Sequence, residues 1–311
     1  MNNITLKQMR YFEALAQHRH FGRAAEVCAI SQPALSMQIK DLEDTLGAAL
    51  FERQARHLGL TGLGEEFLIR VRAIVQAVDE LSELARASTD LMTGRLRLGV
   101  IPTIAPYMLP SIIRRLTDQH PQLDIHIRET LTPTLLRELS EGRLDAALVA
   151  LPVSEPSLTE IALFSEEFVL VRPADDAHSP VPDGDTLREM RLLLLEEGHC
   201  FRDQALAFCN QRLARPRELL DGSSLTTLVQ MVGAGLGVTL IPAMAMDIEA
   251  RTAGVSVAQF ASPAPTRTIG MIWRRTSPLA RQFTQIAGIV CQAAQSLNCQ
   301  PLAAWQDDCG S

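Results

Sequence analysis

The sequence predicts an all-α N-terminal domain, a long linking helix and a C-terminal α/β domain of two lobes. Three observations support this fold class. Apolar residues recur at helical spacing through residues 6–85. From Gly94 onward, short apolar runs of strand length alternate with helical segments. A second set of alternating segments begins near residue 168, so we expect the C-terminal part to form two lobes.

Composition limits the class of protein. The 311 residues are 47% hydrophobic and 21% charged, as in an ordinary globular protein. The N-terminus carries no signal-peptide pattern and no apolar run approaches 18 residues, so we expect a cytoplasmic protein without membrane contact. The six cysteines are Cys28, Cys200, Cys209, Cys291, Cys299 and Cys309. They lack CxxC or zinc spacing, so we expect no bound metal, and we expect no other cofactor. Thiols in the cytoplasm are kept reduced, so we expect no permanent disulfide framework.

Three short helices are predicted in the first 47 residues. Residues 6–18 place Met9, Phe12 and Leu15 on one face, and FGRAAEVC follows as a second helix with its alanines inward. The third helix lies in ISQPALSMQIKDLEDTLG, with Ser31 at the N-cap and Gly47 at the C-terminal stop. Its other face is small or polar, which fits either a helix-turn-helix that enters the major groove or a three-helix core with a solvated face.

The next segment favours the helix-turn-helix. LFERQARHLGLTGLGEEF offers Arg53 and Arg56 and then Thr61 between glycine-containing stretches, as a two-strand wing would. The composite pattern AA…SQPALSxQIxxLE…LGxxLFxR…R…LT…G, over residues 5–66, resembles the LysR-type transcriptional regulators. This resemblance implies a winged helix-turn-helix domain in residues 1–66 that binds double-stranded operator DNA. It places these residues at or near the DNA: Ser31, Gln32, Pro33, Ala34, Ser36, Gln38, Lys40, Arg53, Arg56 and Thr61.

Residues 67–91 are predicted to form a linking helix. Apolar residues recur every three or four positions, which is the spacing of a seam between two paired helices; they are Phe67, Val71, Ile74, Val78, Leu81 and Ala85. A single surface helix would show the same stripe. We interpret the segment as a dimerisation helix, and two-fold protein symmetry then predicts two-fold DNA sites.

The remaining chain predicts a regulatory domain over residues 92–298, with a parallel sheet and a periplasmic-binding-protein-like architecture. We assign lobe I to about 92–165 and 269–298, and lobe II to about 166–268. The cleft between such lobes is the default ligand site. GAGLG follows a helix and precedes a strand, so it is read as a helix end and not as a dinucleotide-binding turn. Residues 299–311 are expected to be a loosely ordered tail.

The segment EEGHCFRDQALAFC holds Cys200 and Cys209. If residues 201–211 form one helix, nine residues separate the two thiols by about 13.5 Å along the axis. A disulfide needs Cα atoms within about 7 Å. The cysteines therefore either never pair or pair only after the segment refolds. A helix N-terminus and the neighbouring His199 and Arg202 would favour a reactive thiolate at Cys200, whereas Cys209 lies on an apolar face where most cysteines belong to a core.

A narrower resemblance bears on this choice. EEGHCFRDQALAFC is similar to the redox segment of the hydrogen-peroxide-sensing branch of the LysR-type family, and so are GVIPTIAPYMLP, RETLTPTLL, GAGLGVTLIPA and RTIGMIWR, so that the similarity spans residues 5–295. It implies that Cys200 is the cysteine that reacts with peroxide and Cys209 the one that resolves it. It also implies a peroxide pocket made of Thr103, Thr132, His199, Asp203 and Arg267. Phe201 and Pro133 depart from the usual pattern of the branch.

We therefore expect a peroxide-sensing transcriptional activator of antioxidant genes that is not an enzyme and takes hydrogen peroxide as its signal. The resemblance implies homodimers that assemble into homotetramers, contact with RNA polymerase, and reduction by glutaredoxin or thioredoxin. Two alternatives remain open at this point. One is a LysR-type regulator that responds to a small ligand in the inter-lobe cleft, and the other is a thiol peroxidase-like enzyme.

Overall fold

The structure is a computed structural model that describes residues 4–54, 57–87, 92–208, 221–251, 253–297 and 299–305. The chain divides into two compact units, Met1–Ala85 and Arg86–Ser311, and each is described by itself. None of the helices in these described ranges is long and apolar enough to cross a lipid bilayer.

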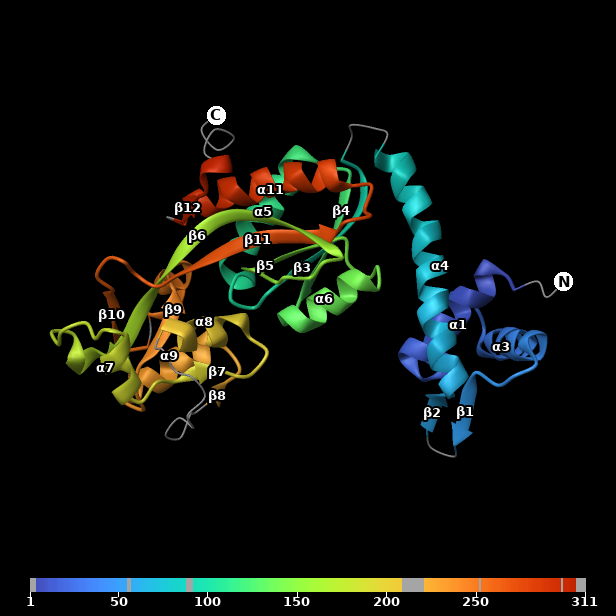
Figure 1. Cartoon of the computed structure of the whole chain (residues 1–311), viewed down its shortest axis with the longest axis horizontal. Helices are drawn as coiled ribbons and strands as arrows, with labels where there is room; N and C mark the ends of the chain where they lie inside the picture. The colour runs from blue at the N-terminus through green and yellow to red at the C-terminus, as the bar shows by residue number, and fades with distance from the viewer. Residues whose placement is uncertain are drawn as a thin grey trace. The chain divides into compact units, whose positions relative to one another are not determined.

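The first unit has the predicted three helices and wing. Its elements are α1 (Leu6–His18), α2 (Phe21–Val27), α3 (Gln32–Leu46), β1 (Phe51–Gln54), β2 (His57–Leu60) and α4 (Gly62–Ala87). The strands β1 and β2 form an antiparallel pair (Figure 1). Phe12, Leu15, Leu35, Ile39 and Leu42 are fully buried, which confirms the apolar faces read from the sequence.

Local signals define the ends of α3. The Ser31 hydroxyl accepts a hydrogen bond from the Ala34 amide at 3.4 Å, as an N-cap does. Gly47 ends the helix with a φ of 68°, in the left-handed region that glycine adopts without steric cost. Both predicted ends of the third helix are confirmed.

The long helix α4 begins earlier than the predicted boundary at residue 66. It starts at Gly62, and the Thr61 hydroxyl accepts from the Gly64 amide at 2.9 Å just before the first turn. The first turns also belong to the core of the N-terminal domain, since Val71 is 1% exposed and the Phe67 ring lies edge-on to Phe12 at 5.2 Å. Residues 88–91 of the predicted linker lie outside the described residues.

Lobe I of the second unit contains the predicted alternation of strands and helices. Its elements are β3 (Gly94–Val100), α5 (Ala105–Gln119), β4 (Leu123–Glu129), α6 (Thr132–Ser140), β5 (Ala146–Leu151) and α11 (Ala280–Gln295). The strand β3 lies parallel to both β4 and β5. Figure 1 shows α5 and α11 on one face of this sheet and α6 on the other.

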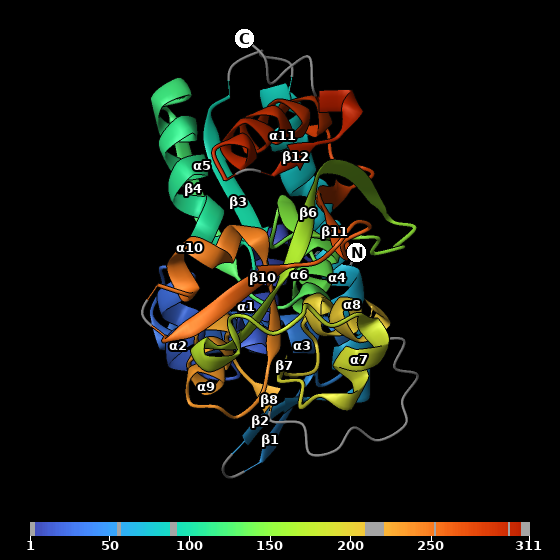
Figure 2. The same cartoon turned by 90° about the vertical axis from the view of Figure 1, so that its left-hand side faces the viewer.

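Two long strands, β6 (Leu158–Pro173) and β11 (Thr266–Arg274), run through both lobes, as Figure 2 also shows. They are antiparallel to each other, and β11 is antiparallel to β5, so the sheet is mixed. The predicted parallel sheet is confirmed for β3, β4 and β5 and is wrong for β6 and β11. A mixed sheet arises because the chain leaves lobe I along β6 and must return along β11. Lobe II contains α7 (Gly184–Glu189), β7 (Leu194–Leu195), α8 (Cys200–Phe208), β8 (Asp221–Gly222), α9 (Leu225–Gly233), β9 (Thr239–Pro242), α10 (Met246–Glu249) and β10 (Val255–Gln259).

The GAGLG segment lies between α9 and β9, as the sequence predicts. A Cβ atom on Gly233 would clash with the Ala253 carbonyl oxygen, so only glycine fits where the helix ends. The segment therefore turns the chain from the helix into a buried strand.

The prediction of a loosely ordered tail is wrong for residues 299–305. Gln300–Pro301 (β12) pairs with Ser165 and Phe164 of β6, and the buried Trp305 donates from Nε1 to the Ala162 carbonyl at 2.9 Å. Cys299 is buried as well, and burial, with a smaller effect of Glu166, raises the pKa of its thiol to about 12. Residues 306–311, with Cys309, lie outside the described residues.

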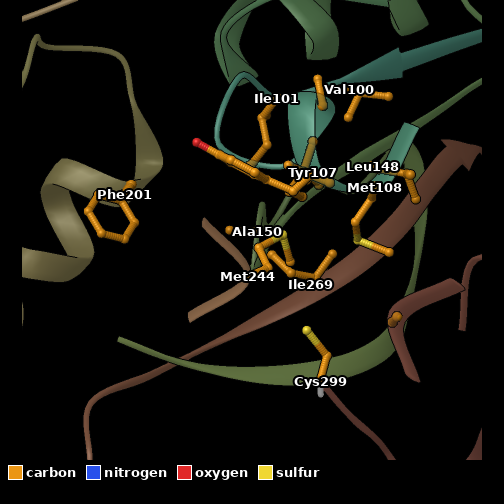
Figure 3. Packing of buried hydrophobic residues seen from close by; sticks show 14 of the residues in the cluster. Val100, Ile101, Tyr107, Met108, Leu148, Ala150, Phe201, Met244, Ile269 and Cys299 are labelled. Carbon is orange, nitrogen blue, oxygen red and sulfur yellow. The ribbon is translucent and has the colours of Figure 1, made fainter. Parts of the chain in front are cut away.

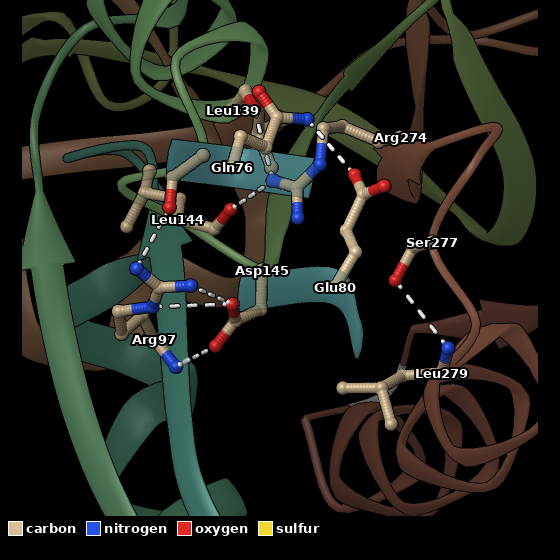
Figure 4. Close-up of polar contacts among 10 residues, drawn as sticks. Gln76, Glu80, Arg97, Leu139, Leu144, Asp145, Arg274, Ser277 and Leu279 are labelled. Carbon is tan, nitrogen blue, oxygen red and sulfur yellow. Dashed lines mark hydrogen bonds and ion pairs between the residues drawn. The ribbon is translucent and has the colours of Figure 1, made fainter. Parts of the chain in front are cut away.

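Two arginines, the buried Arg274 and the half-buried Arg97, anchor α6 and the turn after it to the sheet (Figure 4). Arg274 donates from Nη1 to the carbonyl oxygens of Leu139 and Leu144, at 3.0 and 2.7 Å, near the end of the helix. Arg97 donates from Nε to Asp145 Oδ1 at 3.1 Å and from Nη1 to the Gly142 carbonyl at 2.7 Å. These contacts fix the position of α6, whose first residue is Thr132.

Candidate functional site: a thiol pocket between the two lobes

A small pocket lies between the lobes and contains the Cys200 segment. Its walls are Ile101, Pro102, Thr103, Leu131 and Thr132 from lobe I, and Gly198, His199, Cys200 and Phe201 from lobe II. Four of the predicted site residues therefore line the pocket: Thr103, Thr132, His199 and Cys200.

Cys200 is the first residue of α8 and is partly exposed. The chain reaches it through Gly198, which has a φ of 95° and lies against Leu131 of lobe I. Arg202 donates from Nη1 to the Leu195 carbonyl at 2.8 Å and so ties the helix to the strand before it. Cys200 therefore lies at the N-terminal end of α8, where the backbone amides of the first turn point toward the pocket side of the helix start.

His199 is the neighbour of the thiol and is 8% exposed. Burial lowers the pKa of its imidazole, and this effect exceeds the opposing attraction of Glu196. The ring is therefore neutral near pH 7, with one nitrogen that donates and one that accepts a hydrogen bond.

The Thr132 hydroxyl oxygen is buried in the pocket and has no hydrogen-bond partner in the described part of the chain. A buried hydroxyl without a partner is costly in a folded protein, so its place in the pocket suits a polar ligand. Pro133 follows it in the first turn of α6 and is exposed. This departure from the usual pattern leaves the threonine in place.

Arg267 lies behind Thr103 and is not on the wall of the pocket. Its guanidinium is fully buried, donates from Nη1 to the Thr103 hydroxyl at 2.8 Å, and donates from Nη2 to the Thr103 carbonyl at 3.1 Å. The guanidinium therefore does not line the pocket itself, but it fixes the position of Thr103, which does.

Glu166 is a functional residue that the sequence did not reveal. Its carboxylate pairs with Arg267, with Nε 2.8 Å from Oε2, and it also accepts from the Met244 amide at 2.9 Å. Glu166 and Arg267 are cross-strand partners in β6 and β11. Opposite charges at paired positions are a recognisable signal, but only once the two strands are known to be neighbours.

Phe201 fills the space beside this ion pair. It is 1% exposed, its ring lies edge-on to Phe168 at 4.9 Å, and the Arg267 guanidinium carbon is 5.6 Å from its ring centroid. A cation at this distance from an aromatic ring is attracted by the ring. The departure at this position thus gives the buried arginine an aromatic neighbour.

Two predicted site residues are not brought to the pocket. Asp203 is exposed on α8 and does not line the pocket. Residues three apart share a face of a helix, but Asp203 lies one turn further along α8 than Cys200, and its side chain is in solvent. Cys209 lies outside the described residues, because α8 is described only to Phe208.

The predicted DNA-contacting residues lie mostly on the outer face of α3. Gln32, Pro33 and Lys40 are exposed, Ala34, Ser36 and Gln38 are partly exposed, and the Ser31 hydroxyl is engaged as the helix cap. The Thr61 hydroxyl donates to the Ala49 carbonyl at 2.9 Å in addition to capping α4. Arg53 is in β1, with its side chain outside the described part of the structure, as is Arg56 entirely.

The predicted dimerisation stripe on α4 divides into two parts. Phe67 and Val71 pack in the domain core, Val78 is partly buried, and Ile74 and Leu81 are 45% and 66% exposed. Ile69 and Leu84 add further exposed apolar surface on the same helix. Ala85 has no described side-chain environment.

Comparison with known proteins decides the family. Residues 6–65 match the bacterial regulatory helix-turn-helix protein family of the lysR type, and residues 89–292 match the LysR substrate binding domain. The chain belongs to the LysR family of bacterial transcriptional regulators, in its OxyR branch. The predicted family, fold class and DNA-binding character are thereby confirmed.

The similar proteins span nearly the whole chain. The DNA-binding transcriptional dual regulator OxyR of Escherichia coli K12 is 40% identical over 287 residues, which cover 91% of this chain and 94% of that protein. A probable hydrogen peroxide-inducible genes activator of Streptomyces viridosporus is 41% identical, with coverages of 94% and 95%.

Solved structures agree. A full-length OxyR variant from Pseudomonas aeruginosa is 37% identical, with a TM-score of 0.76 and coverages of 93% of this chain and 95% of that chain. A hydrogen-peroxide-bound OxyR mutant from Corynebacterium glutamicum is 36% identical, with a TM-score of 0.66 and coverages of 95% and 94%.

Proposed function

We propose that this LysR-family regulator senses hydrogen peroxide through Cys200 and changes transcription of antioxidant genes. The observation that carries the proposal is the pocket itself. A cysteine at a helix N-terminus lines a small, mostly apolar pocket together with a neutral His199 and Thr132, whose hydroxyl has no partner among the described residues. These groups suit a small, uncharged molecule that both donates and accepts hydrogen bonds.

The proposed chemistry consumes one peroxide. The Cys200 thiolate attacks one peroxide oxygen, the O–O bond breaks, and the sulfur becomes a sulfenic acid. The leaving hydroxide takes up a proton and departs as water. Thr132 and His199 orient the peroxide, while Arg267 holds Thr103 in position.

The sulfenic acid then condenses with the thiol of Cys209, which forms the Cys200–Cys209 disulfide and releases a second water. The ends of α8, Cys200 and Phe208, are about 12 Å apart along the helix axis, so a bond between Cys200 and the residue after Phe208 requires the helix to unwind. Unwinding of α8 thus converts the oxidation of one side chain into a change in the conformation of lobe II.

Assembly completes the proposal. The exposed apolar residues of α4 pair with a second copy to form a homodimer, and dimers assemble into tetramers on a two-fold operator. The refolded α8 segment alters subunit packing and thereby contact with RNA polymerase. Glutaredoxin or thioredoxin reduces the disulfide and ends the signal, and no bound cofactor is required.

The test is peptide mass spectrometry of reduced protein treated with one equivalent of hydrogen peroxide and then alkylated. We expect a dominant Cys200–Cys209 crosslink that is absent in Cys200→Ser. Free thiols at both positions would contradict the proposal and favour a regulator with another cleft ligand. Sustained peroxide consumption over many turnovers with a reductant would instead favour a peroxidase.

A further inference from the structure

A second buried contact joins the two lobes, away from the thiol pocket. The Tyr107 hydroxyl of α5, in lobe I, donates to Glu249 Oε1 of α10, in lobe II, at 2.7 Å. Both side chains are buried, at 6% and 8% exposed. Figure 3 shows Tyr107 among the apolar side chains of lobe I, with its hydroxyl oxygen directed away from them.

The lobe I end of this contact is tied to Thr103. The first turn of α5 is continuous with the pocket wall, because the Ala105 amide donates to the Ile101 carbonyl and the Tyr107 amide to the Ile104 carbonyl, at 3.0 and 3.1 Å. Only one helical turn separates Tyr107 from Thr103. A displacement of Tyr107 is therefore transmitted to the threonine through hydrogen-bonded backbone.

The lobe II end is tied to Glu166. Glu249 belongs to the short helix α10 that continues directly from Met244, and the Met244 amide donates to Glu166. Glu166 in turn pairs with Arg267, and Arg267 holds Thr103. The buried polar contacts thus close a ring across the lobes, from Tyr107 through Glu249, Glu166 and Arg267 back to Thr103.

The chemistry of the pair suits a permanent contact. Burial, together with the bond to Glu249, raises the pKa of the Tyr107 phenol, so the hydroxyl stays a donor at physiological pH. A hydrogen bond to a charged group is stronger than a neutral one, and loss of the donor leaves a buried carboxylate undersatisfied.

We infer that Tyr107 and Glu249 are positioning residues for the peroxide reaction, because their bond holds the two walls of the thiol pocket at a fixed separation. One wall carries Thr103 and Thr132, and the other carries His199 and Cys200. This inference rests on the proposed function. It predicts that loss of the bond slows the reaction of Cys200 with a reagent that both walls must orient. The reaction with a reagent that needs no orientation by the walls should not slow.

The test compares two reactions of Cys200 in the full-length protein. In Tyr107→Phe, which removes one oxygen and keeps the ring, we expect the second-order rate constant with hydrogen peroxide to fall about tenfold or more. The rate of alkylation of Cys200 by iodoacetamide should stay the same or rise. A peroxide rate within twofold of wild type, or an equal fall in both rates, would overturn the inference. A wild-type protein that peroxide does not oxidise would overturn the proposed function instead.

Matched variants complete the design. Tyr11→Phe removes the other tyrosine hydroxyl of the chain, in the N-terminal unit, and should leave the peroxide rate unchanged. Glu249→Gln keeps an acceptor and should react faster than Glu249→Ala, which should match Tyr107→Phe. The double variant Tyr107→Phe/Glu249→Ala should be no slower than either single variant. If the double variant reacted with peroxide more slowly than either single variant, by the product of their two effects, the two residues would not act through one shared hydrogen bond.

Discussion

Arg267 and Glu166 form a fully buried ion pair in which Nε and Nη2 of the guanidinium lie 2.8 and 2.7 Å from the same carboxylate oxygen. The pair joins β6 to β11, and the remaining guanidinium nitrogen holds the Thr103 hydroxyl. A single buried cation thus links the strands that cross between the lobes to the wall of the thiol pocket.

Glu166→Gln should therefore destabilise the regulatory unit strongly. Removal of one charge leaves the Arg267 cation buried and unpaired, which costs about 3–5 kcal/mol. Urea unfolding followed by tryptophan fluorescence measures this, since both tryptophans, Trp273 and Trp305, are in that unit. Glu167→Gln alters the exposed neighbouring carboxylate and should cost less than about 1 kcal/mol. Equal losses in the two variants would show that the ion pair is not the cause.

Phe201 should affect both stability and the peroxide reaction. Phe201→Ala removes a fully buried ring and should cost about 3–5 kcal/mol. Phe201→Leu should cost less, yet still change the peroxide rate, because it removes the ring beside Arg267. The matched control is Phe208→Leu, at the other end of α8, where the ring contacts Phe260 instead. A peroxide rate that responds to Phe208→Leu and not to Phe201→Leu would contradict this role.

His199 should make the protein less stable in acid. Burial lowers its pKa in the folded protein below the ordinary value of 6.5, so between the two values the unfolded chain binds more protons. Its contribution to stability is therefore fully present above pH 6.5 and is lost as the pH falls toward the lower, folded-state value. We expect His199→Gln to flatten the dependence of the urea midpoint on pH between 7 and 5. An unchanged slope would mean that other groups dominate this range.

The C-terminal segment should stabilise the hinge strand β6. Trp305→Ala removes a buried indole and its bond to the Ala162 carbonyl, and should cost about 3–5 kcal/mol. Thermal unfolding followed by circular dichroism measures the loss. Deletion of residues 306–311 is the control and should leave the midpoint within about 1 °C, since it spares the Trp305 contacts. A variant Trp305→Ala as stable as wild type would show that the segment is merely a surface addition.

Local sequence signals were sufficient to predict the helices of the N-terminal domain. Ser31 and Gly47 mark the ends of α3 by side-chain and backbone properties that act over one helical turn, and both were predicted correctly. The alternation of strands and helices likewise predicted lobe I. Residues Cys200, His199, Thr103 and Thr132 were placed together only through family resemblance, and the structure brings all four to one pocket.

What the sequence did not predict depends on partners far apart along the chain. Glu166 lies 101 residues from Arg267, and Tyr107 lies 142 residues from Glu249. No pattern within one helix or strand identifies such pairs, because the first forms only when β6 lies beside β11 and the second only when α5 lies near α10. The order of residues 299–305 was missed for the same reason, since two-residue β12 has no periodicity of its own and is defined by its partner strand.

The two crossing strands also govern when the protein becomes a sensor during its synthesis. The N-terminal unit has its own hydrophobic core within the first 85 residues, so it can fold soon after it leaves the ribosome. The thiol pocket cannot, because Thr103 is held by an arginine that is translated 164 residues later. A nascent chain therefore carries a finished DNA-binding fold well before its cysteine pocket exists.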